Sequence, residues 1–162
     1  MLLTEEWYLP DKYIHAVRNV LGRIDFNPRS SEEANQTIQA ALFYQDEEYS
    51  LGQNWMGPLF LMFPLPAQNL TYFIDKFISE WFLGRVDQAI LLLPSDTSSR
   101  WFQCLISKVD ALCFVKGKIG FYSPFFRCTQ NRHGSIFYYV GPNVEDFMRE
   151  FSVFGYTLCP PL

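Results

Sequence analysis

Basic and aromatic side chains alternate in residues 114–133, and both types are suited to binding a nucleic acid. The basic members are Lys116, Lys118, Arg127, Arg132 and His133. Lysine and arginine neutralise phosphates, and aromatic rings stack on bases. A solvated hairpin packed on the core would show the same pattern, so both interpretations stay open. Because the net charge is −4, any nucleic-acid surface is expected to be local.

Other reactive side chains have simpler explanations. Ser95-Asp96-Thr97 looks like a reactive cluster, but these residue types are typical of a helix N-cap. Cys104 and Cys113 stand among large apolar residues and are predicted to be reduced core thiols. The histidines, His15 and His133, are too far apart in sequence to suggest a metal site, so no metal is expected. The sequence holds no nucleophile-elbow motif and no Gly-x-Gly-x-x-Gly phosphate loop.

The elements that must position these residues begin with an amphipathic helix over residues 10–22, which Gly22 is expected to end. Residues 23–26 are predicted to form a strand that ends at a turn, because Asn27-Pro28 disfavours continuation. Ser30 followed by Glu33 is a capping-box pattern, which predicts a second helix with its apolar face on residues 34–42.

Alternation of strands and helices continues after a polar segment, 44–56, that is predicted to be a loop. Residues 59–63 are continuously apolar, as in a strand covered on both faces. The remaining predicted elements are a helix over 73–81, a strand over 88–93, a helix over 101–106 capped by residues 97–99, strands over 111–115, 118–122 and 135–140, and a helix over 144–154. This order predicts a single α/β domain over residues 1–162, with a central, mostly parallel sheet that binds ligands at the carboxyl ends of its strands.

Composition is that of a folded chain, with 18% aromatic and 19% charged residues. No apolar run approaches the roughly 20 residues of a membrane-spanning helix, so no membrane association is expected. The N-terminus lacks the basic start and apolar core of a secretory signal, which favours a cytoplasmic protein. Trp55, Trp81 and Trp101 are predicted to be core residues.

Several stretches, taken in order, resemble the phage-type DNA adenine-N6 methyltransferase (Dam) family. They are Glu6-Trp7-Tyr8-Leu9-Pro10, residues 24–31 with 33–35, residues 59–64, Thr97 to Gln103, residues 113–119, residues 133–137 and residues 140–142. The resemblance implies a Rossmann-like domain that takes a methyl group from S-adenosylmethionine and places it on adenine in DNA. It also implies the cytoplasm of a bacterial host or of a phage-infected cell.

The family's catalytic motif is Asn/Asp-Pro-Pro-Tyr/Phe, and the aligned residues here are Met62, Phe63, Pro64 and Leu65. In the motif, a side-chain oxygen and a backbone carbonyl accept the two N–H bonds of the adenine amine, and the aromatic ring stacks on the extruded base. Met62 offers only a weak thioether acceptor and Leu65 offers no π face. The resemblance therefore predicts a degenerate catalytic site on a retained scaffold.

Positions expected to meet the cofactor also differ from the family pattern. The resemblance implies Asp-Pro where this chain has Asn27-Pro28, and Thr-Pro where it has Leu9-Pro10. An aspartate accepts from the hydroxyl or ammonium groups of the cofactor, whereas leucine accepts nothing. The residues expected to contact S-adenosylmethionine, where binding is retained, are Trp7, Leu9, Pro10, Asn27, Pro28 and Ser30.

Three hypotheses follow. The first is a degenerate methyltransferase with lost or weakened catalysis that acts by binding DNA or a protein partner. The second is an active enzyme in which the Phe63 carbonyl and a side chain such as Asn69 or Asp96 replace the lost acceptor. The third is an interaction protein that uses residues 62–66 as an apolar patch.

Overall fold

Strands that carry the longest apolar runs lie at the centre of a mixed sheet. The computed structural model describes residues 7–123 and 131–161, and these form a seven-stranded sheet in the order β2-β1-β3-β4-β6-β5-β7. The strands are β1 (Phe26–Asn27), β2 (Leu42–Phe43), β3 (Leu59–Met62), β4 (Ala89–Pro94), β5 (Ala111–Val115), β6 (Ser135–Val140) and β7 (Gly155–Leu158). Strands β2, β1, β3 and β4 pair in parallel, and β6 and β7 pair with antiparallel neighbours. The prediction of an α/β, Rossmann-like fold is confirmed, with a sheet that is parallel in its core of β2, β1, β3 and β4 and mixed as a whole.

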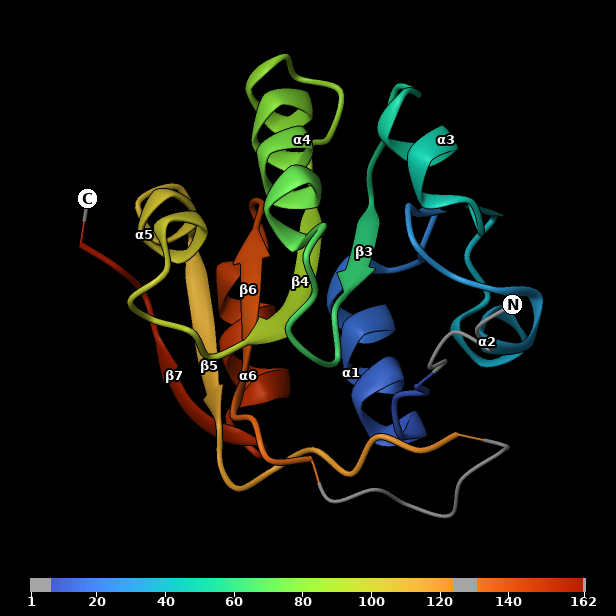
Figure 1. The fold of residues 1–162 in the computed structure, drawn as a ribbon. Coiled ribbons are helices and arrows are strands. Elements are labelled where there is room, and N and C mark those ends of the chain that lie inside the picture. Colours follow the sequence, from blue (N-terminus) through green and yellow to red (C-terminus); the bar gives the residue numbers. More distant parts are fainter. Residues whose placement is uncertain (1–6, 124–130, 162) are drawn as a thin grey trace.

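Helices cover both faces of this sheet, as Figure 1 shows. The helices are α1 (Asp11–Leu21), α2 (Glu32–Ile38), α3 (Glu47–Leu51), α4 (Leu70–Phe82), α5 (Arg100–Ile106) and α6 (Val144–Phe151). The buried residues of α1 and α6 belong to one core cluster, and those of α4 and α5 belong to the other. The sheet is therefore the middle layer of three, which explains why β3 and β4 are apolar on both faces.

Alternation along β3 sends successive side chains into different cores. Phe60 and Met62 pack with α1 and α6, whereas Leu61 packs with α4 and α5. Phe63, the next residue, follows the same alternation and packs beside Leu61. This period of two follows from strand geometry. It decides which residues of the 62–65 stretch can face a ligand.

The first helix and the central strands match their predicted ranges closely. Helix α1 ends where Gly22 adopts a φ of 79°, a conformation that residues with a Cβ rarely adopt. The first strand is Phe26–Asn27 rather than residues 23–26, so its predicted bounds are wrong. Asn27 continues the strand because it pairs in parallel with Phe43 of β2, a partner that the local sequence does not reveal.

The cap of α2 is Ser31, not Ser30. The Ser31 hydroxyl oxygen accepts a hydrogen bond from the Ala34 N–H at 3.1 Å. The helix ends at Ile38, earlier than its predicted apolar face over residues 34–42 suggested, and Leu42 belongs to β2. The N–H of Ser30 instead donates to the Tyr44 carbonyl, which ties the turn after β1 to the segment after β2.

Two further predictions about elements are wrong. The segment 44–56 is not only a loop, because it contains α3, whose N-cap Asp46 accepts from the Tyr49 N–H at 2.8 Å. Residues 118–122 form no regular strand: Tyr122 makes an isolated bridge with Tyr8. The edge strand β7 was not anticipated.

Single residues predicted to be core are placed with mixed success. Trp55, Trp101 and Cys113 are buried as expected, and Trp81 is partly buried. Cys104 is exposed, because it lies on the solvent side of α5, so its prediction as a core thiol is wrong.

No helix of residues 7–123 and 131–161 is long and apolar enough to cross a membrane. Within the same ranges, no group of three or more histidine, cysteine, aspartate or glutamate residues could hold a metal ion.

Candidate functional site

The candidate site lies where the strand order of the sheet reverses. The chain passes from β1 to β2 on one side of β1, and then crosses back to add β3 and β4 on the other side. In open α/β sheets, this reversal leaves a crevice at the carboxyl ends of the two strands that flank it. Those ends are occupied here by Asn27 of β1 and Met62 of β3.

A two-part cleft opens at this point. One part has a volume of about 220 Å³ and is lined by Trp7, Tyr8, Asn27, Arg29, Ser30, Ser31, Ala34, Ile38, Gln45, Glu47, Met62 and Pro64. The adjoining part, of about 320 Å³, is lined by Tyr8, Leu9, Ile14, Glu33, Ala34, Gln36, Thr37, Ile38, Met62 and Tyr122. The parts share Tyr8, Ala34, Ile38 and Met62. Together they fall within the size range of small-molecule sites.

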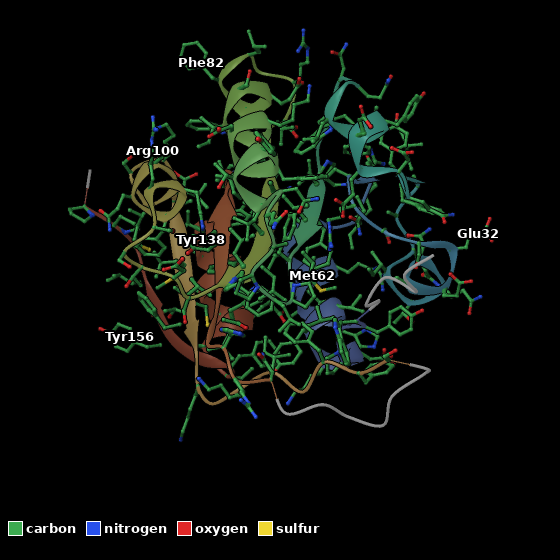
Figure 2. All side chains as sticks on the ribbon, viewed as in Figure 1. Glu32, Met62, Phe82, Arg100, Tyr138 and Tyr156 are labelled. Carbon is green, nitrogen blue, oxygen red and sulfur yellow. The ribbon has the colours of Figure 1, made fainter. Side chains whose placement is uncertain are left out.

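Met62 is the only residue of the 62–65 stretch that lines both parts of the cleft. Figure 2 shows its side chain at the end of β3, well away from Arg100 on α5. Phe63 is 1% exposed and points into the opposite core, where its ring meets Phe73 edge-on at 5.4 Å. The cleft is therefore open, with Met62 in its wall and Phe63 outside it.

The apolar patch proposed for residues 62–66 does not exist as a surface. Met62, Phe63 and Pro64 are buried, Leu65 is partly buried, and of the five only Pro66 is exposed. Met62 and Pro64 line the cleft instead of an exposed patch, so the hypothesis of an interaction protein that uses this stretch stays a prediction about the cleft.

Arg29 is a charged side chain that contacts the end of β3. Its Nε donates to Glu47 Oε1 at 2.7 Å, and its NH1 group donates to the Met62 carbonyl at 3.4 Å. The guanidinium carbon lies 4.4 Å from the centroid of the Phe63 ring, which is cation–π distance. Arg29 therefore links the loop after β1, the start of α3 and the end of β3.

Asn27 holds Arg29 in place through the backbone. The Asn27 side-chain oxygen accepts from the Arg29 N–H at 3.1 Å, closing an Asx turn directly after β1. The buried Ser50 hydroxyl donates to the Pro28 carbonyl at 2.6 Å and fixes the same turn from α3. The Asn27 oxygen is thus already engaged within the protein. The neighbouring Ser30 hydroxyl is buried on the cleft and has no hydrogen-bond partner among the described residues.

A buried ion-pair network is connected to the end of β3 through the packed rings of Trp55, Phe73 and Phe63. Glu80 is 2% exposed and accepts from Lys76 at 2.7 Å, from Arg85 and from the Trp55 N–H. Burial opposes ionisation of this carboxyl, but the hydrogen bonds from Lys76, Trp55 and Arg85 outweigh burial and hold the pKa below its ordinary value. The Trp55 ring packs against Phe73, which in turn packs against Phe63.

Predicted basic residues gather at the same edge of the sheet as the cleft. Lys116 and Lys118 follow the carboxyl end of β5, which runs in the same direction as β4 because both are antiparallel to β6. Arg132 and His133 precede β6 and so lie at this edge too, and all four side chains are exposed. Arg127 lies outside the described residues.

Two backbone links join the basic segment to the cleft. The N–H of Tyr8 donates to the Tyr122 carbonyl, and the N–H of Tyr122 donates to the Tyr8 carbonyl. Their rings meet edge-on at 5.6 Å, and both residues line the cleft. The segment that carries Lys116 and Lys118 is therefore adjacent to the larger part of the cleft.

Sequence reasoning placed some residues on the cleft and missed others. Of the expected cofactor contacts, Trp7, Leu9, Asn27 and Ser30 line it, whereas Pro10 and Pro28 are not among its lining residues. Asn69 and Asp96, named as substitute acceptors, do not line it either: Asn69 precedes α4 without a side-chain capping hydrogen bond, and Asp96 is exposed after β4.

Arg29, Gln45 and Glu47 were missed because they are polar residues in turns or, for Glu47, at the start of the short helix α3, where solvent exposure is the usual expectation. One signal was available for Glu47. An acidic residue about 20 positions after the first strand is a common ribose-binding position in doubly wound folds.

Comparison with known proteins identifies the family of the chain. The family model for DNA N-6-adenine-methyltransferase (Dam) matches residues 3–149. No curated protein and no solved structure gives a significant match. The match includes the whole cleft, the β3 end and the basic edge. The chain therefore belongs to the DNA N-6-adenine methyltransferase (Dam) family.

Proposed function

We propose that this chain binds S-adenosylmethionine in its cleft and binds DNA along the adjoining basic edge, and that it transfers methyl groups to adenine far more slowly than the family's motif would allow. The observation that carries the proposal is an open cleft at the switch point whose wall, at the acceptor position, holds Met62 instead of an amide or carboxylate. A retained ligand site and an altered catalytic position are separable properties of one fold.

The cleft suits a nucleoside cofactor that carries an amino acid group. Glu47 follows the strand next to β1, a position from which a carboxylate can accept from ribose hydroxyls. The buried Ser30 hydroxyl, without a partner among the described residues, is available to a polar group of the ligand. Trp7 offers an aromatic wall on the same part of the cleft. When bound, the cofactor would supply an electrophilic methyl group.

The basic edge suits the DNA backbone. Lys116, Lys118, Arg132 and His133 are exposed and lie at the carboxyl edge, beside the cleft. Phosphate contacts at this edge would place the duplex over the end of β3, where an extruded base would enter. A local basic edge also fits the net charge of −4, which gives the rest of the surface an acidic balance.

Weak catalysis follows from the side chains at positions 62 and 65. The Met62 thioether, at the position of the motif's side-chain acceptor, is a poor acceptor for the adenine amine. Loss of one well-placed polar group at a transition state costs on the order of a hundredfold in rate. Leu65 cannot stack on a base as an aromatic ring does.

The cofactor part of the proposal is tested by calorimetry of the whole chain with S-adenosylmethionine. Micromolar binding is expected, and Ser30→Ala together with Glu47→Gln should weaken it, while Glu48→Gln at an exposed site of α3 should not. Absence of heat at millimolar cofactor would refute cofactor binding. Expression in a methylation-deficient host, with sequencing for modified adenine, tests the other part: sparse or no modification is expected, and dense modification would refute weakened catalysis.

A second candidate is a fully active adenine methyltransferase with an unconventional acceptor. It is favoured by Gln45, whose carboxamide carries the same acceptor chemistry as an asparagine and lines the same part of the cleft as Met62. In this case Gln45→Ala would abolish methyl transfer. Under the main proposal Gln45→Ala leaves the slow rate unchanged.

A further inference from the structure

We infer that Arg29 supplies the flat stacking surface that Leu65 lacks, and that an extruded adenine stacks on its guanidinium group. This inference rests on the proposed function, because it assigns the base-binding element of the same site. Arginine planes stack on unpaired bases in the same way that aromatic rings do. The guanidinium group lies at the end of β3, where the extruded base would enter, because its NH1 group reaches the Met62 carbonyl.

The contacts of Arg29 determine which part of the guanidinium is left for a ligand. Its Nε edge is taken by Glu47 at 2.7 Å, and one NH1 edge is directed to the Met62 carbonyl. The Phe63 ring lies 4.4 Å from the guanidinium carbon and occupies one region above the plane. What remains for a ligand is the part of the group that faces the cleft, which is lined by Arg29 and has a volume of about 220 Å³.

Stacking on a base fits these contacts better than gripping an anion. A bidentate hydrogen-bonded contact to a phosphate or carboxylate through the Nε edge would have to displace Glu47, and one through the NH1 edge would compete with the Met62 carbonyl. The Glu47 charge also neutralises the cation, which weakens its attraction to a distant anion but not its stacking on a neutral base. With Nε paired to Glu47, NH1 directed to the Met62 carbonyl and a side-chain exposure of 28%, the group is oriented at the cleft wall.

The test compares two labelled single strands, one carrying a single adenine and the other an abasic site at the same position. Wild-type protein should bind the adenine strand more tightly by on the order of tenfold. Arg29→Lys keeps the charge and loses the plane, so its two affinities should become equal while its affinity for the abasic strand stays unchanged. Arg29→Gln, with a planar amide, should retain part of the preference.

Arg100→Lys is the matched control, because it makes the same chemical change at an exposed residue of α5, away from Met62 (Figure 2). It should leave the preference intact. Thermal unfolding and calorimetry with S-adenosylmethionine show whether each variant keeps its fold and its cleft.

A preference for adenine that survives in Arg29→Lys would refute the inference and leave the proposed function standing. Loss of S-adenosylmethionine binding in Arg29→Lys, with the preference retained, would assign Arg29 to the cofactor and also refute it. Failure of the wild-type chain to bind either strand would instead refute the proposed function.

Discussion

Glu80→Gln tests whether the buried ion-pair network stabilises the support of the candidate site. The substitution removes the charge that receives hydrogen bonds from Lys76, Arg85 and the Trp55 N–H. Removing one partner of a fully buried pair costs about 3–5 kcal/mol. The side chains of Lys76 and Arg85 are 19% and 43% exposed, so water can solvate part of their charge after Glu80 is replaced. About 2 kcal/mol of unfolding free energy should therefore be lost.

The pH dependence of stability gives this prediction a second readout. The pKa of Glu80 in the folded protein lies below its ordinary value of 4.5, because the hydrogen bonds outweigh the effect of burial. The charged carboxylate therefore contributes stability above pH 4.5, and this contribution is lost as the pH falls below that value towards the folded pKa. In Glu80→Gln this acid-sensitive component should be absent.

Urea unfolding at neutral pH and at steps below pH 4.5 measures both effects, with Glu48→Gln as the control at an exposed site. Because Trp55 packs on Phe73 behind Phe63, the fluorescence of the tryptophans should also change in the folded variant. An unfolding free energy and a pH profile equal to those of the wild type would show that the network contributes no stability.

Three further predictions concern the N-cap of α2, the basic edge and the edge strand β7. Ser31→Ala should cost about 1 kcal/mol of unfolding free energy through loss of the α2 cap, whereas Ser30→Ala should cost less; equal losses in urea unfolding would argue against this assignment of the cap. Lys116→Gln and Lys118→Gln should each weaken DNA binding for all sequences and reduce the slope of log affinity against log salt by about 0.9, and unchanged slopes would remove the basic edge from the DNA site. Gly155→Ala should destabilise the fold by about 1–3 kcal/mol, because a Cβ there would overlap the β5 backbone; a melting temperature equal to that of the wild type would contradict the pairing of β7.

Elements with a strong apolar pattern could be predicted from sequence. The spacing of apolar residues in α1, and the unbroken apolar runs of β3 and β4, give helix and strand directly. Short elements could not be predicted in this way. Helix α3 has five residues and β2 has two, and each is stabilised by contacts with segments distant in sequence.

The choice between Ser30 and Ser31 illustrates a limit of local patterns. Both are serines followed three residues later by a residue that suits a first turn, so sequence alone allows either cap. Pairing of β1 with β2 decides between them, because it places the Ser30 N–H against the Tyr44 carbonyl.

The site was predicted in part for a similar reason. Met62 and Asn27 end strands, and strand ends can be identified from apolar runs and turn residues. Arg29 and Glu47 are 18 positions apart and meet only because β1 and β2 are parallel neighbours. The opposite directions of Met62 and Phe63 follow from strand alternation, once the register of β3 is known.

Single-turnover transfer of labelled methyl from S-adenosylmethionine to unmethylated, mixed-sequence DNA tests most directly the proposal that catalysis is weakened. Wild-type protein is compared with Met62→Asn, with Leu65→Tyr and with the double variant, each first shown to bind the cofactor as the wild type does. We expect a very slow wild-type rate and a gain on the order of a hundredfold in the double variant, because the variant carries an amide acceptor and an aromatic ring at these positions. A wild-type rate on the order of one per second or faster, with no gain in the double variant, would contradict it.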